Sequence, residues 1–374
     1  MNILILGGTG AMGQPLVNLL SKEHKVFVTS RNVKKSIGNI EYLLGNAQNI
    51  DFLRKVLLMY NWDAVVDFMV RTEENLKNFS PLFFECTKQY IFISSCRVYS
   101  QTEQKITEET PRLLDVSTDI EYLNTNEYAL AKAREENVLL NSGRTNFTII
   151  RPTITYNTYR LQLGVLEKEN WLYRALHGRA IVFSDDINNK LTTMTLGDDM
   201  ATGIASIIGQ EGAVGKVYHI TYPESRLWSE ILVIYLNVLE KHLGRSVPVI
   251  MTPKSTNLKF KHRIYQLIYS RYFNRTFDNS KISKFCDIDR FTAPEDGLTK
   301  CLEEFLKAPK FGTIAWDLEA VNDKVSGERT LLREIPTYHD KLVYLAYRYD
   351  LKFLLSIEII FKKVIFNIKR LTRK

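Results

Sequence analysis

A strand-like run that passes directly into a glycine-rich turn and then a helix constrains this chain more than any other feature. Residues 2–6 (NILIL) are followed at once by residues 7–13 (GGTGAMG), whose glycines fit both GxGxxG and GxxGxxG. Glycines permit a tight turn and let the backbone approach a pyrophosphate, which then lies on free N–H groups at a helix N-terminus. Because a strand and a helix flank the motif, it indicates a dinucleotide-binding loop rather than an ordinary glycine-rich turn. The predicted cofactor-binding residues of the loop are Gly7, Thr9, Gly10, Ala11, Met12 and Gly13.

Strand-like apolar runs alternate with helical patterns along the rest of the first half. These runs are at residues 25–29, 63–69, 90–95 and 147–150, with a further one at 216–220. Buried strands that alternate with helices are typical of a parallel sheet covered on both faces. The pattern therefore predicts a Rossmann-type, doubly wound parallel α/β sheet.

The length of 374 residues favours two domains over one. We assign residues 1–155 to a dinucleotide-binding domain, which 189–220 continue with a strand, a turn at Gly197-Asp198-Asp199 and a helix. A smaller α+β substrate-binding domain is expected from 156–188 and 221–310. Residues 311–339 are polar and weakly patterned, and we expect a linker there, before a tail at 340–374.

The end of the second predicted strand bears on which dinucleotide fits. A site that prefers NAD usually has an acid there, roughly 20 residues after the glycine loop, but this chain has Thr29-Ser30-Arg31-Asn32. The planar guanidinium of Arg31 can pair with a 2′-phosphate. We therefore predict NAD(P), with NADP favoured, and assign Ser30 and Arg31 to the cofactor site. A solvated basic turn is the alternative that remains open.

Tyr128 and Lys132 have a YxxxK spacing at the start of a predicted helix. Residues i and i+4 share a helix face, so both side chains can face one cleft. An ammonium group and a positive nicotinamide favour a phenolate, which can take the proton of a substrate hydroxyl while hydride moves to the cofactor. Ser95 ends the strand run 90–95, at the carboxyl edge where doubly wound sheets bind ligands, and can hydrogen-bond the same oxygen. The predicted catalytic residues are thus Ser95, Tyr128 and Lys132.

These motifs, in this order, resemble the extended short-chain dehydrogenase/reductases, the group of nucleotide-sugar epimerases and dehydratases. The resemblance covers roughly residues 1–300 and includes an SSxxVY-like segment at 94–99 and an Arg-Pro-Thr segment at 151–153. It implies that Tyr128 and Lys132 also contact the cofactor, together with Phe68, Met69, Pro152 and Thr153. Gly45-Asn46 stands where the family has Gly-Asp near adenine, so Asn46 is assigned to the cofactor site despite this departure.

Two further departures narrow the subclass. The 4,6-dehydratases place Thr-Asp-Glu where this chain has Ser95-Cys96-Arg97, so an acid and base for eliminating water are missing. Fucose-synthase-like enzymes have a cysteine one place nearer the tyrosine than Cys96. We therefore assign Cys96 no catalytic role and expect a buried small residue.

Residues 259–275 (KFKHRIYQLIYSRYFNR) interleave basic and aromatic side chains. In the family, this part of the smaller domain meets the substrate diphosphate, and spacing does not choose between Arg271 and Arg275. The predicted substrate-binding residues are Ser95, Arg97, Arg271 and Arg275. The leading hypothesis is an NAD(P)-dependent epimerase or keto-reductase acting on a sugar carbon, with a nucleotide-sugar-like substrate. The alternative is a regulatory or RNA-binding protein on the same fold, although the YxxxK spacing weighs against nucleic acid.

The net charge of +8 is concentrated near the end of the chain, because residues 340–374 have nine basic and three acidic side chains. Apolar residues recur there at three- and four-residue intervals, which predicts a basic amphipathic helical tail. Such a helix can dock on the protein itself or on a second subunit of a homodimer, which we favour, or lie peripherally on an anionic membrane. Scattered histidines predict no metal site. Four cysteines without a CxxC pair are typical of a reducing, cytoplasmic compartment, and no apolar stretch is long enough to span a membrane.

Overall fold

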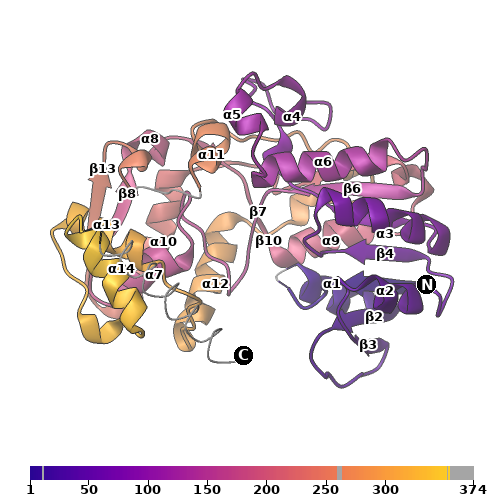
Figure 1. Cartoon of the computed structure of the whole chain (residues 1–374), viewed down its shortest axis with the longest axis horizontal. Coiled ribbons are helices and arrows are strands. Elements are labelled where there is room, and N and C mark those ends of the chain that lie inside the picture. The colour runs from indigo at the N-terminus through magenta and orange to yellow at the C-terminus, as the bar shows by residue number, and fades with distance from the viewer. Residues whose placement is uncertain (11, 259–262, 352, 354–374) are drawn as a thin grey trace, which may run out of the picture.

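The computed structural model describes residues 1–374 except 11, 259–262, 352 and 354–374. Figure 1 shows two lobes side by side, one containing the N-terminal strands and the other the last described helices. The first lobe is built on a seven-stranded parallel sheet in the order β11-β6-β5-β4-β1-β2-β3. Its strands are β1 (Asn2–Leu6), β2 (Lys25–Ser30), β3 (Ile40–Leu44), β4 (Ala64–Asp67), β5 (Tyr90–Ile93), β6 (Phe147–Pro152) and β11 (Lys216–Ile220).

Helices cover both faces of this sheet (Figure 1). The main ones are α1 (Gly13–Leu20), α2 (Ile50–Leu57), α3 (Glu73–Cys86), α6 (Tyr128–Leu140) and α9 (Gly197–Ile207). Ile3 and Ile5 of β1 pack in one apolar cluster with α1 and α9, whereas Leu4 and Leu6 pack in another with α2, α3 and α6. Successive strand residues point to opposite faces, so a strand covered on both sides is apolar throughout. The predicted Rossmann-type, doubly wound sheet is thereby confirmed.

The chain reverses its direction across the sheet between β1 and β4, which are hydrogen-bonded neighbours. Ligands of doubly wound sheets bind outside the carboxyl ends of the strands at this switch point. The glycine turn after β1 lies there and is tightly packed. Gly7 has φ +74°, which favours glycine, and a Cβ on Gly13 would lie 2.6 Å from the Cα of Gly8. Side chains at these positions would distort the turn.

Two parts of the first lobe differ from the expectation. The edge strand β3 was not expected, because its sequence IEYLL is only half-buried and includes a glutamate. The strand expected within 191–208 is divided into β9 (Leu191–Thr192) and β10 (Met194–Leu196), which pair outside the main sheet with β12 (Arg226–Leu227) and β7 (Ile154–Tyr156). Gly197 begins α9 directly instead of forming a turn before it. This stretch leaves the sheet and contributes Thr192 and Thr193 to a pocket wall.

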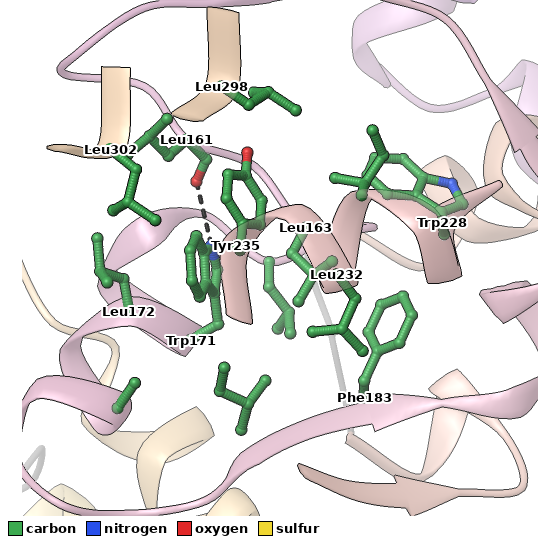
Figure 2. Close-up of a cluster of buried hydrophobic side chains, with 14 of the residues drawn as sticks. Leu161, Leu163, Trp171, Leu172, Phe183, Trp228, Leu232, Tyr235, Leu298 and Leu302 are labelled. Carbon is green, nitrogen blue, oxygen red and sulfur yellow. Dashed lines mark hydrogen bonds between the residues drawn. The ribbon is translucent and has the colours of Figure 1, made fainter. Parts of the chain in front are cut away.

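The second lobe has its own hydrophobic core, shown in Figure 2. Trp171, Trp228 and Tyr235 are fully buried there, and the Trp171 indole N–H donates to the Leu161 carbonyl oxygen at 3.1 Å. Strands β8 (Ile181–Ser184) and β13 (Val249–Thr252) of this lobe pair in parallel. The elements of this lobe include α7 (Lys168–Leu176), β8 (Ile181–Ser184), α8 (Asp185–Asn188), α10 (Trp228–Leu243), β13 (Val249–Thr252), α11 (Ile264–Gln266) and α12 (Pro294–Lys307). Two short helices, α4 (Leu113–Val116) and α5 (Ile120–Leu123), precede α6.

The prediction of a linker at 311–339 is wrong, because this stretch is folded into helices. This stretch contains α13 (Trp316–Ser326) and the first residues of α14 (Tyr338–Arg348), and both helices pack on the second lobe. The fully buried guanidinium of Arg174 on α7 pairs with Glu319 at 2.7 Å, Asp323 at 2.8 Å and Glu328 at 2.9 Å. The stretch looks polar in the sequence because ion pairs, as much as apolar contacts, hold it in the interior.

The expected amphipathic tail lies mostly outside the described residues. Of residues 340–374, the structure describes α14 and the few residues after it, up to 351, and Phe353. The apolar stripe of 354–371 is not among them. Among the helices that are described, none is both long and apolar enough to cross a membrane.

Replacing Arg174 by alanine should destabilise the protein by about 3–5 kcal/mol, because Asp323 would stay buried without a cation and Glu319 would keep only Arg179, at 3.1 Å. The free energy of unfolding in urea is the measurement. Arg290→Ala is the control, since its side chain is 86% exposed and its ion pair with Asp287 lies at the surface; it should change the free energy by less than about 0.5 kcal/mol. Equal small effects of both substitutions would show that the ion pairs do not anchor α13.

Candidate active site

A pocket of about 540 Å³ lies at the carboxyl edge of the parallel sheet and extends to the second lobe. It contains most of the residues that the sequence predicted for a site. Those in its wall are Gly7, Gly10, Met12, Gly13, Phe68, Met69, Ser95, Arg97, Tyr128, Lys132, Pro152, Thr153, Arg271 and Arg275. Segments separated by more than 260 residues in the sequence thus meet at one cavity.

The buried carboxylate of Glu136 ties together the elements that carry the predicted catalytic residues. Its oxygens accept hydrogen bonds from Arg151 Nε at 2.8 Å and Nη2 at 2.7 Å, and from Ser94 Oγ at 2.6 Å. Arg112 donates a further hydrogen bond at 3.2 Å. Since Ser94 follows β5 and Arg151 lies on β6, this carboxylate fixes α6 against both strands. Tyr128 and Lys132 on α6 are thereby held at the pocket that Ser95 also lines.

Lys132 is buried and makes an ion pair within its own helix. Its Nζ lies 2.8 Å from Glu135 Oε2 and 4.7 Å from the centre of the Phe92 ring. Burial raises the pKa of the Glu135 carboxyl, and Asp67 adds to this rise, whereas Lys132 and Arg71 oppose it. The carboxylate therefore offsets part of the positive charge that Lys132 presents to the pocket.

Ser95 and Tyr128 have different exposures. Ser95 is 7% exposed, and its Oγ accepts a hydrogen bond from the Arg97 backbone N–H at 3.2 Å, which fixes the turn that follows β5. Tyr128 is 44% exposed and begins α6, whose N-cap is Glu127. Both residues line the pocket, so the phenol is accessible to a ligand and the serine is held in place.

Cys96 is buried, as expected for a small packing residue. It is 4% exposed, and its Sγ lies 2.9 Å from the carbonyl oxygen of Arg151. Burial raises the pKa of this thiol well above its ordinary value. A nucleophilic thiol needs the opposite shift, so the environment of Cys96 gives no support to a catalytic role.

Not every predicted cofactor residue belongs to the pocket wall. Ser30 is the last residue of β2, and its Oγ donates to the Asn32 carbonyl oxygen at 2.8 Å, whereas Arg31 follows the strand and is exposed. Asn46 is also exposed, at the end of the neighbouring strand β3, and its Oδ1 accepts from the Gln48 N–H at 3.0 Å. Thr9 is exposed in the glycine turn, and Ala11 lies outside the described residues. Ser30, Arg31 and Asn46 occupy the carboxyl edge on the β2–β3 side of that turn.

Arg271 and Arg275 differ in how their side chains are used. Arg275 donates to backbone carbonyl oxygens of the turn after β5, to Cys96 at 2.6 Å and to Tyr99 and Ser100 at 3.4 Å, and so clamps that turn. Arg271 donates to the Gly164 carbonyl oxygen at 3.0 Å and to Ser270 Oγ at 2.9 Å. Within the described part of the chain, neither guanidinium forms an ion pair with a carboxylate. Arg271 is the better placed of the two to bind an anion.

The electrostatics of this wall favour an anionic ligand. Burial, together with the guanidiniums of Arg97, Arg275 and Arg160, lowers the pKa of Arg271. Burial also lowers the pKa of Arg275. A bound anion would neutralise these charges. Because both arginines are buried inside a pocket, they do not form the open basic surface expected of an RNA-binding segment.

Several polar groups of the site were not predicted from the sequence. They include the carboxylates of Glu127, Glu135 and Glu136. They also include Thr155 and Gln162, which line the pocket; the buried Thr155 Oγ1 and Gln162 Oε1 lack a hydrogen-bond partner among the described residues. One signal was present: two adjacent glutamates follow Lys132 by three and four positions, the spacing of a helical ion pair. The two unpartnered oxygens have no such local signal.

Comparison with known proteins places these features in context. The model of the NAD dependent epimerase/dehydratase family matches residues 3–221. A trifunctional UDP-glucose 4,6-dehydratase/UDP-4-keto-6-deoxy-D-glucose 3,5-epimerase/UDP-4-keto-L-rhamnose-reductase from Arabidopsis thaliana is 23% identical over 348 residues, which cover 83% of this chain and 48% of that protein. The chain thus spans about half the length of the curated relatives it matches.

Solved structures share the fold. UDP-glucuronic acid 4-epimerase from Bacillus cereus, in complex with UDP-glucuronic acid and NAD, aligns with a TM-score of 0.60 and 18% identity over 82% of this chain and 100% of that chain. The dTDP-glucose 4,6-dehydratase from Bacillus anthracis, in complex with NAD, also gives 0.60 and 18%, over 82% of this chain and 97% of that chain. At such identities the similarity establishes the architecture alone.

Proposed function

The chain belongs to the NAD dependent epimerase/dehydratase family, and we propose that it moves a hydride between NAD(P) and a carbon of a nucleotide sugar, as an epimerase or a keto-reductase. The observation that carries this proposal is the meeting of four groups at one pocket. The glycine turn, Ser95, Tyr128 and Lys132 all line it, at the switch point of the parallel sheet.

The residues of the glycine turn fit a dinucleotide. A Cβ on Gly10 would have nothing nearer than 3.8 Å, so the backbone there faces open space, whereas Gly13 lies against Gly8 and brings α1 close. The first-turn N–H groups of a helix lack acceptors within the helix and suit a phosphate. Gly7, Gly10 and the start of α1 would hold the pyrophosphate. When bound, the dinucleotide supplies the site that accepts or donates hydride.

The protein's part of the reaction is the movement of a proton. We assign Tyr128 as the group that takes the proton of the substrate hydroxyl, or returns it to the carbonyl oxygen in the reverse direction. Ser95 would hydrogen-bond the same oxygen and orient it. The Lys132 ammonium favours the phenolate, while Glu135 moderates that effect through its 2.8 Å ion pair. Arg271, which has no carboxylate partner in the described chain, would hold the diphosphate.

Tyr128→Phe should lower turnover of a nucleotide sugar by about 100-fold or more, since general acid–base catalysis typically contributes that much. Dinucleotide affinity should remain close to that of the parent, because the ring is retained. Turnover is followed by chromatography of the sugar nucleotides, and cofactor affinity by calorimetry. Tyr338→Phe, in a side chain that is 77% exposed on α14, is the matched control. Parental turnover by Tyr128→Phe would remove this residue from the mechanism.

Glu135→Gln should move the rising limb of the rate–pH profile to lower pH. Without the carboxylate, the full charge of Lys132 acts on the tyrosine and favours its phenolate. The profile of kcat/KM against pH is the measurement. Glu121→Gln, which removes an exposed acid on α5, should leave the profile unchanged. If Glu135→Gln has the parental profile, the ion pair does not tune the site.

We also propose that the protein prefers NADP to NAD, and that Arg31 is the residue responsible for this preference. The residue is exposed at the end of β2, where an acid would favour NAD. Its guanidinium would pair with the 2′-phosphate of NADP.

Arg31→Ala should weaken NADPH binding by about 1.5–3 kcal/mol, the value of a charge-assisted hydrogen bond, and leave NADH binding nearly unchanged. Dissociation constants of both cofactors, from quenching of protein fluorescence, provide the comparison. Arg54→Ala, at an exposed position on α2, controls for a general loss of positive charge. Losses of equal size for NADPH and NADH would refute the preference for NADP.

A further inference from the structure

The wall of the pocket that carries Arg271 is a short helical segment of the second lobe. It consists of α11 and a π-helical turn at Leu267–Arg271. Four of its residues line the pocket, namely Arg263, Gln266, Ser270 and Arg271. The place of the proposed diphosphate ligand therefore depends on what holds this segment against the first lobe.

Two tyrosines of this segment stack on a tyrosine of α5, which lies in the chain between β5 and β6 of the first lobe. The ring centre of Tyr269 is 4.1 Å from that of Tyr122, with 25° between the ring planes. The ring centre of Tyr265 is 4.9 Å from that of Tyr122. Tyr122 is fully buried. These ring contacts join the wall that carries Arg271 to the first lobe.

A hydrogen bond reinforces the stack. The Tyr269 hydroxyl donates to Asp119 Oδ2 at 2.6 Å, and Oδ1 of the same carboxylate accepts from the Tyr122 N–H at 2.9 Å, which caps α5. Burial raises the pKa of Tyr269 to about 12, and the hydrogen bond to Asp119 adds to this rise. The phenol therefore stays protonated as a donor. Asp119 thus ties Tyr269 to the residue on which its ring stacks.

The hydroxyl of Tyr122 extends the chain of contacts to α6. It donates at 3.3 Å to Glu127 Oε2, which also accepts from the Ala129 N–H at 2.7 Å as the N-cap of α6. The other oxygen of Glu127 forms an ion pair with Arg97 Nη2. The guanidinium carbon of Arg97 lies 5.3 Å from the centre of the Tyr128 ring. Glu127 therefore fixes both the start of the helix and the cation beside the Tyr128 ring.

Tyr128 depends on such contacts because it is the first residue of α6 and is 44% exposed. A proton-transferring group must lie within hydrogen-bond reach of its substrate, and small misplacements lower the rate steeply. The contacts begin at Tyr269, two positions before Arg271, and end at Glu127, the residue before Tyr128. The wall that carries Arg271 is thus connected to the proton-transferring residue.

We propose that Tyr269, Tyr122 and Glu127 are positioning residues for Tyr128, through which the wall that carries Arg271 sets the geometry of proton transfer. This inference rests on the proposed function. In the part of the chain that the structure describes, none of these three residues lines the pocket. Their contribution is therefore to the rate of the bound complex and not to the binding of substrate or cofactor.

The test begins with Tyr122→Phe and Tyr269→Phe, which each remove one hydroxyl and keep the ring. Either substitution should lower kcat by about 3- to 10-fold, the fold-change that corresponds to one hydrogen bond. Glu127→Gln, which removes the charge that holds Arg97, should lower kcat at least as much. Dissociation constants of nucleotide sugar and dinucleotide, from calorimetry, should stay within about twofold of the parent, because the pocket wall is intact.

The substrate is whichever of UDP-glucose, UDP-glucuronate and GDP-mannose the full-length parent turns over fastest. Tyr265→Phe is the matched control. This tyrosine belongs to the same stack, but its hydroxyl makes no hydrogen bond among the described residues, so kcat should be parental. Circular dichroism melting of each variant verifies that the fold is retained.

The double variant Tyr122→Phe/Tyr269→Phe separates one connected chain from two independent supports. In a connected chain, its loss of kcat should not exceed the larger single loss, whereas independent supports give losses that multiply. Multiplying losses overturn the inference, as do parental kcat in both single variants, an equal loss in Tyr265→Phe, or weaker binding with kcat retained. In all these cases the proposed function stands. A parent that turns over none of the three nucleotide sugars contradicts the proposed function, and this inference fails with it.

Discussion

The bidentate ion pair between Glu136 and Arg151 is the interaction on which the geometry of the site depends. It lies below the pocket, with the carboxylate fully buried and also bound by Ser94. Removing one partner of such a pair leaves a charge in the interior and typically costs about 3–5 kcal/mol. Its contribution here is positional. It fixes α6 against β5 and β6, so that a tyrosine and a lysine on the helix face a serine at the end of a strand.

Charge organises both lobes, in opposite ways. In the second lobe, Arg174 and its three acids form a closed network that joins α13 to the core. In the pocket, Arg271 and Arg275 form no ion pair with a carboxylate of the described chain, and an anionic ligand would supply that charge. The first arrangement holds the protein together and the second prepares it for an anionic substrate. Burial makes both effects stronger than they would be at the surface.

The sequence predicted features that depend on local order along the chain. The glycine turn, and the pair formed by Tyr128 and Lys132, need only a strand, a turn and a helix in succession. Prediction from the sequence failed where a polar side chain is buried by partners that are distant along the chain. The acids of α13 look like a solvated linker until Arg174, about 150 residues earlier, is placed among them. Likewise, spacing could not distinguish Arg271 from Arg275, because the carbonyl oxygens that occupy Arg275 belong to a turn about 175 residues away.

The proposed activity requires a dinucleotide at the glycine turn. Native mass spectrometry of the full-length protein, with NAD⁺ and NADP⁺ added in turn, tests this most directly. We expect one dinucleotide per chain, and a strong reduction of that complex when Gly10 is replaced by valine, whose side chain would occupy the open space before α1. A parent protein that binds neither dinucleotide at millimolar concentration would contradict it.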